Sequence, residues 1–197
     1  MSDVIDTLAG IEPGSPLDAI RSQRLQARQH AQASYDSLFK PKSEADATRL
    51  ERIAIACFVA GLHGRPEMET FYGRALAEAA APAAWKGTIA AAVAVAKGQG
   101  PYGHYPKGPL SAEDKAGPIF KIAAAERTAL GPKLAAAFEH AHMLVFHPRD
   151  AAPTYLQALI DAGWSTTGIV VISQLVAFLS YQIRVVAGLR VLKARPA

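Results

Sequence analysis

Apolar side chains recur every three or four residues along most of this chain, and the alternating pattern of a β-strand is nearly absent. A spacing of three and four gathers apolar side chains on one face of an α-helix. Alanine, which has the highest helix propensity, is frequent throughout. The pattern predicts an all-α fold of about six to eight helices around one core.

Proline, glycine and small polar residues divide this pattern into helical segments. Ser15 is the expected N-cap of the first, with Pro16 at its first helical position and Pro41 beyond its end near Phe39. Ser43 is the expected N-cap of the second. Helices are predicted over residues 16–39, 43–63, 66–80, 82–96, 120–130, 132–147, 153–163 and 165–193.

Residues 15–193 are predicted to form a single helical domain, preceded by an N-terminal extension over residues 1–14. The helix over residues 82–96 consists mostly of alanine and valine, whose small side chains let a neighbouring helix approach closely. We expect this helix and the long last helix to form the centre of the domain.

The segment over residues 98–118 interrupts the helical pattern with five glycines and four prolines. It also carries the ring side chains of Tyr102, His104 and Tyr105. Long connections of this kind are uncommon in compact domains and often serve a function. The segment is therefore interpreted as a lid, a binding loop or an oligomer contact.

The last predicted helix is apolar over residues 168–189, a stretch long enough to cross a bilayer. It also contains Arg184 and two glutamines, which are costly in hydrocarbon. We therefore expect a buried core or interface helix and no membrane partner. The mean hydropathy of +0.10 is high for a soluble chain of this size, and helices that are apolar all round must bury both faces. A homo-oligomer, dimer or higher, is predicted, with the last helix or the 98–118 loop at its interface.

The formal net charge is +4, and lysine and arginine are scattered without a run of four. This pattern does not favour nucleic acid as a partner. Arg21, Arg24 and Arg28 share one helix face, which is either a solvated face or a phosphate-binding stripe. The first residues show neither a basic segment nor an apolar one, so no signal peptide is visible and a cytoplasmic location is expected.

Cys57 is the single cysteine, and it lies between apolar neighbours in the second helix. One cysteine excludes a disulfide within the chain, a Cys-x-x-Cys pair and a multi-cysteine zinc site. A reactive thiol needs a nearby cation, and none lies one turn away on the same face. Cys57 is interpreted as a small core residue, and no cofactor is predicted.

Four charged or polar residues on the second and last helices have two interpretations each. Glu51 and Arg52 form either a surface ion pair or a buried group facing a pocket. His63 either interacts with the helix C-terminus or serves a site. Arg184 stands alone among apolar residues, so it either pairs with a carboxylate such as Glu51 or Asp150 or binds an anion.

The segment from Glu139 to Asp150 is the densest polar cluster of the sequence. His140 and His147 share a helix face but are separated by about 10 Å of helical rise, too far to hold one metal ion. Glu139 and His142 have a suitable spacing but lack an evident third ligand, so no metal site is predicted. His147, Arg149 and Asp150 either close a pocket or fix the turn.

Three stretches resemble the carboxymuconolactone decarboxylase and alkylhydroperoxidase D-like family. Residues 49–56 with 62–64 are similar to its Glu-Arg helix and active-site turn. Residues 158–184 are similar to its L-x-x-A-G-h-S segment and long helix, and residues 140–150 to a segment of its peroxidase-related branch. The resemblance implies an alkylhydroperoxidase D-like helical domain.

In the family's peroxidases, a Glu-x11-Cys-x2-Cys-x3-His pattern carries the redox chemistry, and no register of this chain reproduces it. The resemblance therefore implies a degenerate peroxidase-related protein without the redox dithiol, working with a peroxidase-like partner protein. The alternatives are a thiol-independent decarboxylase or isomerase, and a small-molecule binding protein for an anionic ligand.

We expect the site between the second and last helices, roofed by residues 102–105. The family keeps its chemistry at the end of the helix that resembles residues 51–64. No catalytic role is assigned to any residue. The candidate pocket residues are Glu51, Arg52, His63, Arg65, Tyr102, His104, Tyr105, His147 and Arg184.

Overall fold

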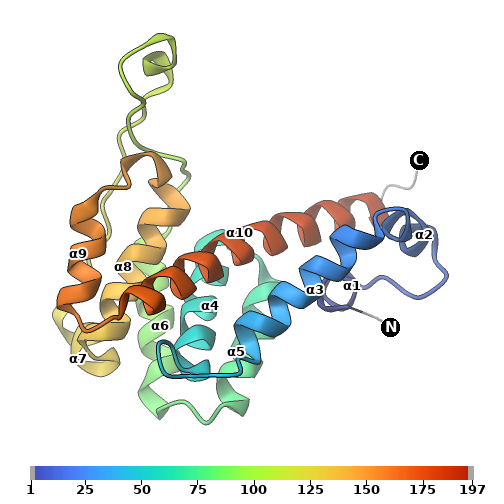
Figure 1. Cartoon of the computed structure of the whole chain (residues 1–197), viewed down its shortest axis with the longest axis horizontal. Helices are drawn as coiled ribbons and strands as arrows, with labels where there is room; N and C mark the ends of the chain where they lie inside the picture. Colours follow the sequence, from blue (N-terminus) through green and yellow to red (C-terminus); the bar gives the residue numbers. More distant parts are fainter. Residues whose placement is uncertain (1–2, 195–197) are drawn as a thin grey trace.

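The computed structural model describes residues 3–194, and within that range it contains ten α-helices, two short 3₁₀ helices and no β-sheet (Figure 1). The all-α prediction is confirmed, although the helices outnumber the six to eight expected. The α-helices are α1 (Val4–Ala9), α2 (Pro16–Ser22), α3 (Leu25–Phe39), α4 (Arg49–His63), α5 (Pro66–Glu78), α6 (Ala83–Ala96), α7 (Ala124–Leu130), α8 (Pro132–Phe146), α9 (Pro153–Asp161) and α10 (Thr166–Ala194).

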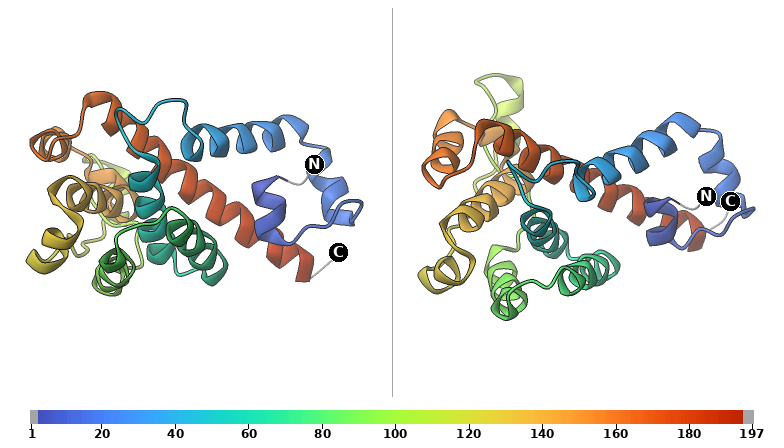
Figure 2. Two further views of the ribbon diagram at one scale, coloured as in Figure 1. Left: turned by 90° about the horizontal axis from the view of Figure 1, so that it is seen from below. Right: turned by 60° about the horizontal axis from the view of Figure 1, so that its bottom comes forward.

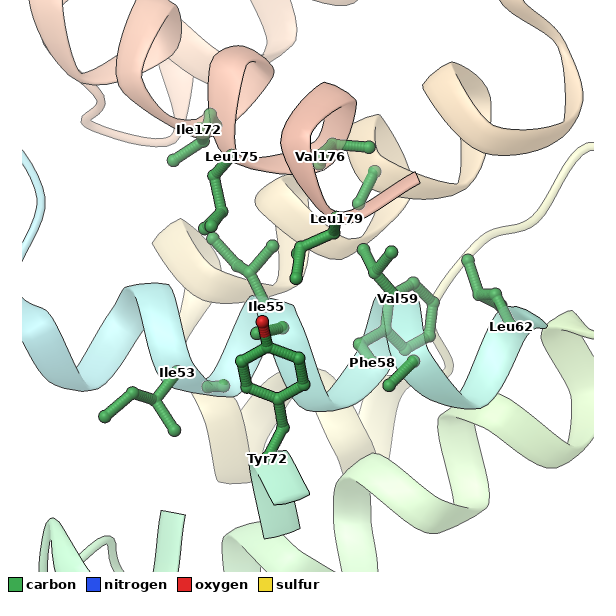
Figure 3. Close-up of a cluster of buried hydrophobic side chains, with 14 of the residues drawn as sticks. Ile53, Ile55, Phe58, Val59, Leu62, Tyr72, Ile172, Leu175, Val176 and Leu179 are labelled. Atoms are coloured by element: carbon green, nitrogen blue, oxygen red, sulfur yellow. The ribbon is translucent and has the colours of Figure 1, made fainter. Parts of the chain in front are cut away.

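Helix α4 forms the centre of the fold, and α5, α6, α8 and α10 pack around it. Every residue from Arg52 to Leu62 is buried except Cys57, which is half-buried. Figure 3 shows the side chains of Ile55 and Val59 directed toward Leu175 and Leu179 of α10. A helix that is apolar on all sides buries its whole surface only when other helices surround it, which explains the central position of α4.

Helix α6 was expected at the centre but buries only one face. Its buried residues are Ile89, Ala92, Val93 and Ala96, whereas Val95 is 77% exposed. The close approach of small residues does occur there, because a Cβ on Gly61 of α4 would lie 2.6 Å from a Val93 methyl. The alanines of α6 therefore serve one contact with α4 and leave the opposite face to solvent.

Three helix starts differ from the prediction, and one of them is α7, which begins at Ala124 and not near residue 120. The expected helix over 16–39 is divided into α2 and α3, because Arg24 leaves the helical region with φ −116° and ψ 52°. Helix α4 begins after Thr48, not after Ser43. The Thr48 side chain accepts from the Glu51 N–H while Glu51 accepts from the Thr48 N–H, a reciprocal capping box.

Residues 3–14 belong to the folded body. Helix α1 packs on the C-terminal half of α10 (Figure 2). Ile5 of α1 is fully buried. Asp6 is also buried and pairs with both Arg21 and Arg28, which Asp3 contacts as well. These two arginines were expected on a solvated or phosphate-binding face, and they instead hold α1 against α2 and α3.

The segment over residues 98–118 forms an arm that rises from the body beside α8 (Figure 1). Gly103 and Lys115 exchange backbone hydrogen bonds at its base. His147 lies buried below them, with Nδ1 3.0 Å from Asp150 Oδ2 and Nε2 2.9 Å from the Pro118 carbonyl. Of the two interpretations of His147 and Asp150, the geometry supports fixing the turn, since both hold the base of the arm.

Candidate functional site

A cleft of about 570 Å³ lies where α4, α8 and α10 meet the start of the arm. Its apolar lining comes mainly from the C-terminal turn of α8 and the middle of α10. Its polar side chains come from α4, α10 and the start of the arm. The lining residues are Leu62, His63, Gly98, Gln99, Gly100, Pro101, Leu144, Val145, Phe146, Pro148, Ser173, Val176, Ala177, Ser180 and Arg184.

His63 occupies the last position of α4, before Gly64 ends the helix in the left-handed conformation with φ 60°. Its Nε2 lies 3.4 Å from Ser180 Oγ of α10. Burial, together with the nearby charges of Arg184 and Arg65, lowers the pKa of His63 to about 4. The imidazole is therefore neutral at pH 7 and presents a hydrogen-bonding nitrogen to the cleft.

Arg184 is exposed, which overturns the expectation of a buried arginine paired with Glu51 or Asp150. Its guanidinium donates to the Ser180 carbonyl one turn earlier, at 3.1 Å. No carboxylate lies within ion-pair distance of it among residues 3–194. The mouth of the cleft thus carries a cation whose charge is not neutralised by the described part of the chain.

Two serines of α10 line the cleft beside these groups. Ser173 and Ser180 are seven residues apart and so project from the same face. Ser173 Oγ lies 2.9 Å from Nε2 of His140, a buried residue of α8. Burial lowers the pKa of His140 to about 4, so this pair is neutral at pH 7. Sequence analysis missed both serines, although their spacing in an otherwise apolar helix is visible.

The wall toward the arm is formed by residues 98–101, and residues 102–105 do not line the cleft. Tyr102 is buried, and its hydroxyl accepts a hydrogen bond from the Gln99 N–H at 2.9 Å. Tyr105 lies further out, with its ring 4.0 Å from the Arg149 guanidinium. His104 is largely exposed. Tyr102 thus holds the wall formed by residues 98–101 in place, and residues 102–105 do not cover the cleft as expected.

Glu51 and Arg52 lie at the opposite end of α4 from His63, about 16–18 Å away along the helix. Glu51 caps the helix and pairs with Lys133 of α8 at 2.9 Å. Arg52 is the buried arginine of this region, and it donates to the backbone carbonyls of Ala47 and Leu38. Both residues fix the structure and take no part in the cleft. Arg65 precedes α5 and does not line the cleft.

Cys57 lies in the middle of α4, away from the cleft lining. Burial raises the pKa of its thiol to about 12. The thiolate is the nucleophilic form of cysteine, and it is essentially unpopulated at neutral pH with such a pKa.

No group of three or more histidine, cysteine or acidic side chains suited to a metal ion occurs among residues 3–194. Glu139 was considered above, with His142, as one of two metal ligands. It pairs with Lys121 and Arg127, and its carboxylate accepts a hydrogen bond from the Ile122 N–H. Its carboxylate is committed to holding residues 121–127 against α8.

Helix α10 is the one described helix long and apolar enough to cross a membrane, and half of its most apolar stretch is buried within the protein. Comparisons of the chain with protein families, with curated proteins and with solved structures give no match.

Proposed function

We propose that the protein binds a small amphiphilic anion, such as a carboxylate with an apolar body, in the cleft between α4, α8 and α10. The observation that carries the proposal is the combination of an apolar wall with an unneutralised cation at the mouth. Ligand pockets are commonly apolar with a few polar groups that fix orientation. His63, Ser180 and Arg184 are such groups, and they lie together at one end of the cleft.

The division of roles follows from the chemistry of each group. The Arg184 guanidinium is always charged and presents a planar fork that matches a carboxylate. Ser180 donates a hydroxyl hydrogen bond. His63 is neutral when the cleft holds no anion, since burial and two arginines disfavour its charged form. A bound carboxylate close to His63 raises the pKa of its imidazole and favours uptake of a proton.

We expect isothermal titration calorimetry to detect hexanoate binding that tightens as the pH falls from 8 to 5. The sign follows from linkage: a group whose pKa rises on binding takes up a proton, so acid favours the complex. Titrations in buffers of different ionisation enthalpy measure that proton directly. Arg184→Gln is expected to weaken binding about tenfold or more, which corresponds to about 1.4 kcal/mol.

Arg65→Gln is the matched control, because Arg65 adds positive charge near His63 without lining the cleft. It is expected to change hexanoate affinity by less than threefold. Hexanol is the matched uncharged ligand and is expected to bind without proton uptake. Equal losses in the two arginine variants, or equal affinities for hexanoate and hexanol, would contradict recognition of a carboxylate by Arg184.

Kinship to the alkylhydroperoxidase D-like family remains a proposal that rests on the sequence stretches named above. The protonated state of Cys57 supports the part of it that excludes thiol chemistry. The purified protein is expected to consume no peroxide in the presence of dithiothreitol, as followed by a peroxide-sensitive dye. A peroxidase-like partner is tested separately, by co-purification from cells.

A further inference from the structure

A stripe of exposed residues runs along α10 with the regular spacing of a helix-pairing seam. Its members are 4, 3, 4, 3, 4 and 3 residues apart, and every one of them is exposed. Three are large and apolar: Val170, Tyr181 and Val191 are 54%, 44% and 61% exposed. The stripe consists of Val170, Gln174, Ala177, Tyr181, Arg184, Gly188 and Val191.

Gly188 gives a second indication that the stripe meets another surface. It lies inside a 29-residue helix, where glycine is less favourable than alanine. Nothing lies within 4 Å of the place that a Cβ would take, so no contact among residues 3–194 requires glycine there. The small residue instead leaves room on the exposed side of α10.

We propose that α10 pairs with α10 of a second copy of this chain, in antiparallel orientation about a twofold axis near residue 179. A 3.5-residue repeat is the spacing at which two helices keep one seam in contact. In a twofold interface, residue i faces residue j and j faces i. With the axis at residue 179, the two residue numbers of each facing pair add up to 358. The facing pairs are Val170 with Gly188, Gln174 with Arg184, and Ala177 with Tyr181.

This register matches size and charge at each of those positions. Val170 and Tyr181 each face a small residue, and the Gln174 side-chain carbonyl faces the guanidinium of Arg184. A parallel pair would bring Arg184 against its own copy and Tyr181 against its own copy, which repels charge and overfills the seam. The complementarity therefore selects a second copy in antiparallel orientation.

The seam adjoins both hollows that flank α10. Ala177 and Arg184 belong to the stripe and also line the cleft with His63. On the other side, Gln174 and Tyr181 line a groove against α3. The second copy would therefore border the open side of each cleft and contribute Gln174 beside Arg184. The α10–α10 dimer is inferred from the stripe alone, so it does not depend on which ligand the cleft binds.

We expect light scattering coupled to size exclusion to give about twice the chain mass of 20.9 kDa for the wild type at micromolar concentration. Gln174→Arg sets two cationic pairs across the seam and is expected to shift the protein to monomer. Adding Arg184→Glu to that variant converts both pairs to opposite charges and is expected to restore the dimer. Ala90→Arg, on the exposed face of α6, is the matched control and should remain dimeric.

Orientation is tested by cysteine cross-linking under mild oxidation. The double variant Val170→Cys with Gly188→Cys is expected to form covalent dimers, whereas Val170→Cys alone is not. A covalent dimer from Val170→Cys alone would indicate parallel helices and overturn the register. A wild type that is monomeric at 100 µM overturns the proposal, as does a monomer that floats with phospholipid vesicles, because lipid would then cover the stripe.

Discussion

Replacing Asp6 with alanine is expected to lower the free energy of unfolding by about 3–5 kcal/mol, the usual cost of removing one partner from a buried ion pair. The Asp6 carboxylate is buried and lies between the guanidinium groups of Arg21 and Arg28. Its loss leaves Asp3 as the carboxylate that contacts both cations where α1, α2 and α3 meet. Urea unfolding followed by circular dichroism measures the change.

Asp18→Ala is the matched control. Asp18 pairs with Arg28 at 2.8 Å but is more exposed, with 21% of its side chain accessible. Solvent-exposed ion pairs contribute little to stability, so a much smaller loss than that of Asp6→Ala is expected. Equal effects of the two aspartate variants would mean that burial does not set the strength of this cluster.

Acid is expected to destabilise the protein between pH 6.5 and pH 4, and this loss begins above the range in which most carboxylates are protonated. Burial lowers the pKa of His63, His140 and His142 to about 4, against 6.5 when they are exposed. The unfolded chain therefore binds protons in this window while the folded chain does not, so stability falls as the pH falls. For His140 alone the loss at pH 4 is about 2–3 kcal/mol.

Thermal melts from pH 7.5 to pH 4 test this expectation. His140→Gln is expected to flatten the lower part of the curve, because glutamine can bond Ser173 and does not titrate. His104→Gln is the control, since His104 is largely exposed. A melting temperature that stays level down to pH 4.5 would show that these histidines are not held neutral.

The helices of the body could be predicted because proline and glycine end them in the sequence as they do in the structure. Helix α8 begins at Pro132, as expected, and α9 at Pro153. Helix α1 is also capped, by Asp3 and Gly10, but its six residues were too few to predict a helix, because a helix that short is stable only through contacts such as those of Ile5 with the rest of the core. Its docking depends on charges 15 and 22 positions away along the chain.

The cleft proposed as the site lies beside the second and last predicted helices, α4 and α10, and its lining was foreseen only in part. His63 and Arg184 line the cleft, whereas Glu51 and Arg52 lie at the other end of α4. Spacing along a helix gives the face on which a residue lies, but not which residue the neighbouring helix covers. Arg184 looked buried because its neighbours in sequence are apolar, yet it falls on the exposed stripe of α10.

The meeting of α1 with the far end of α10 has a consequence for biosynthesis. The Arg190 and Lys193 side chains reach the backbone carbonyls of Leu8 and Gly10, more than 180 residues earlier in the chain. Translation produces α10 after every other helix described, so α1 can contact α3 and α5 before α10 exists. The face of α1 that packs on α10 is therefore covered last, after all the other described helices have been made.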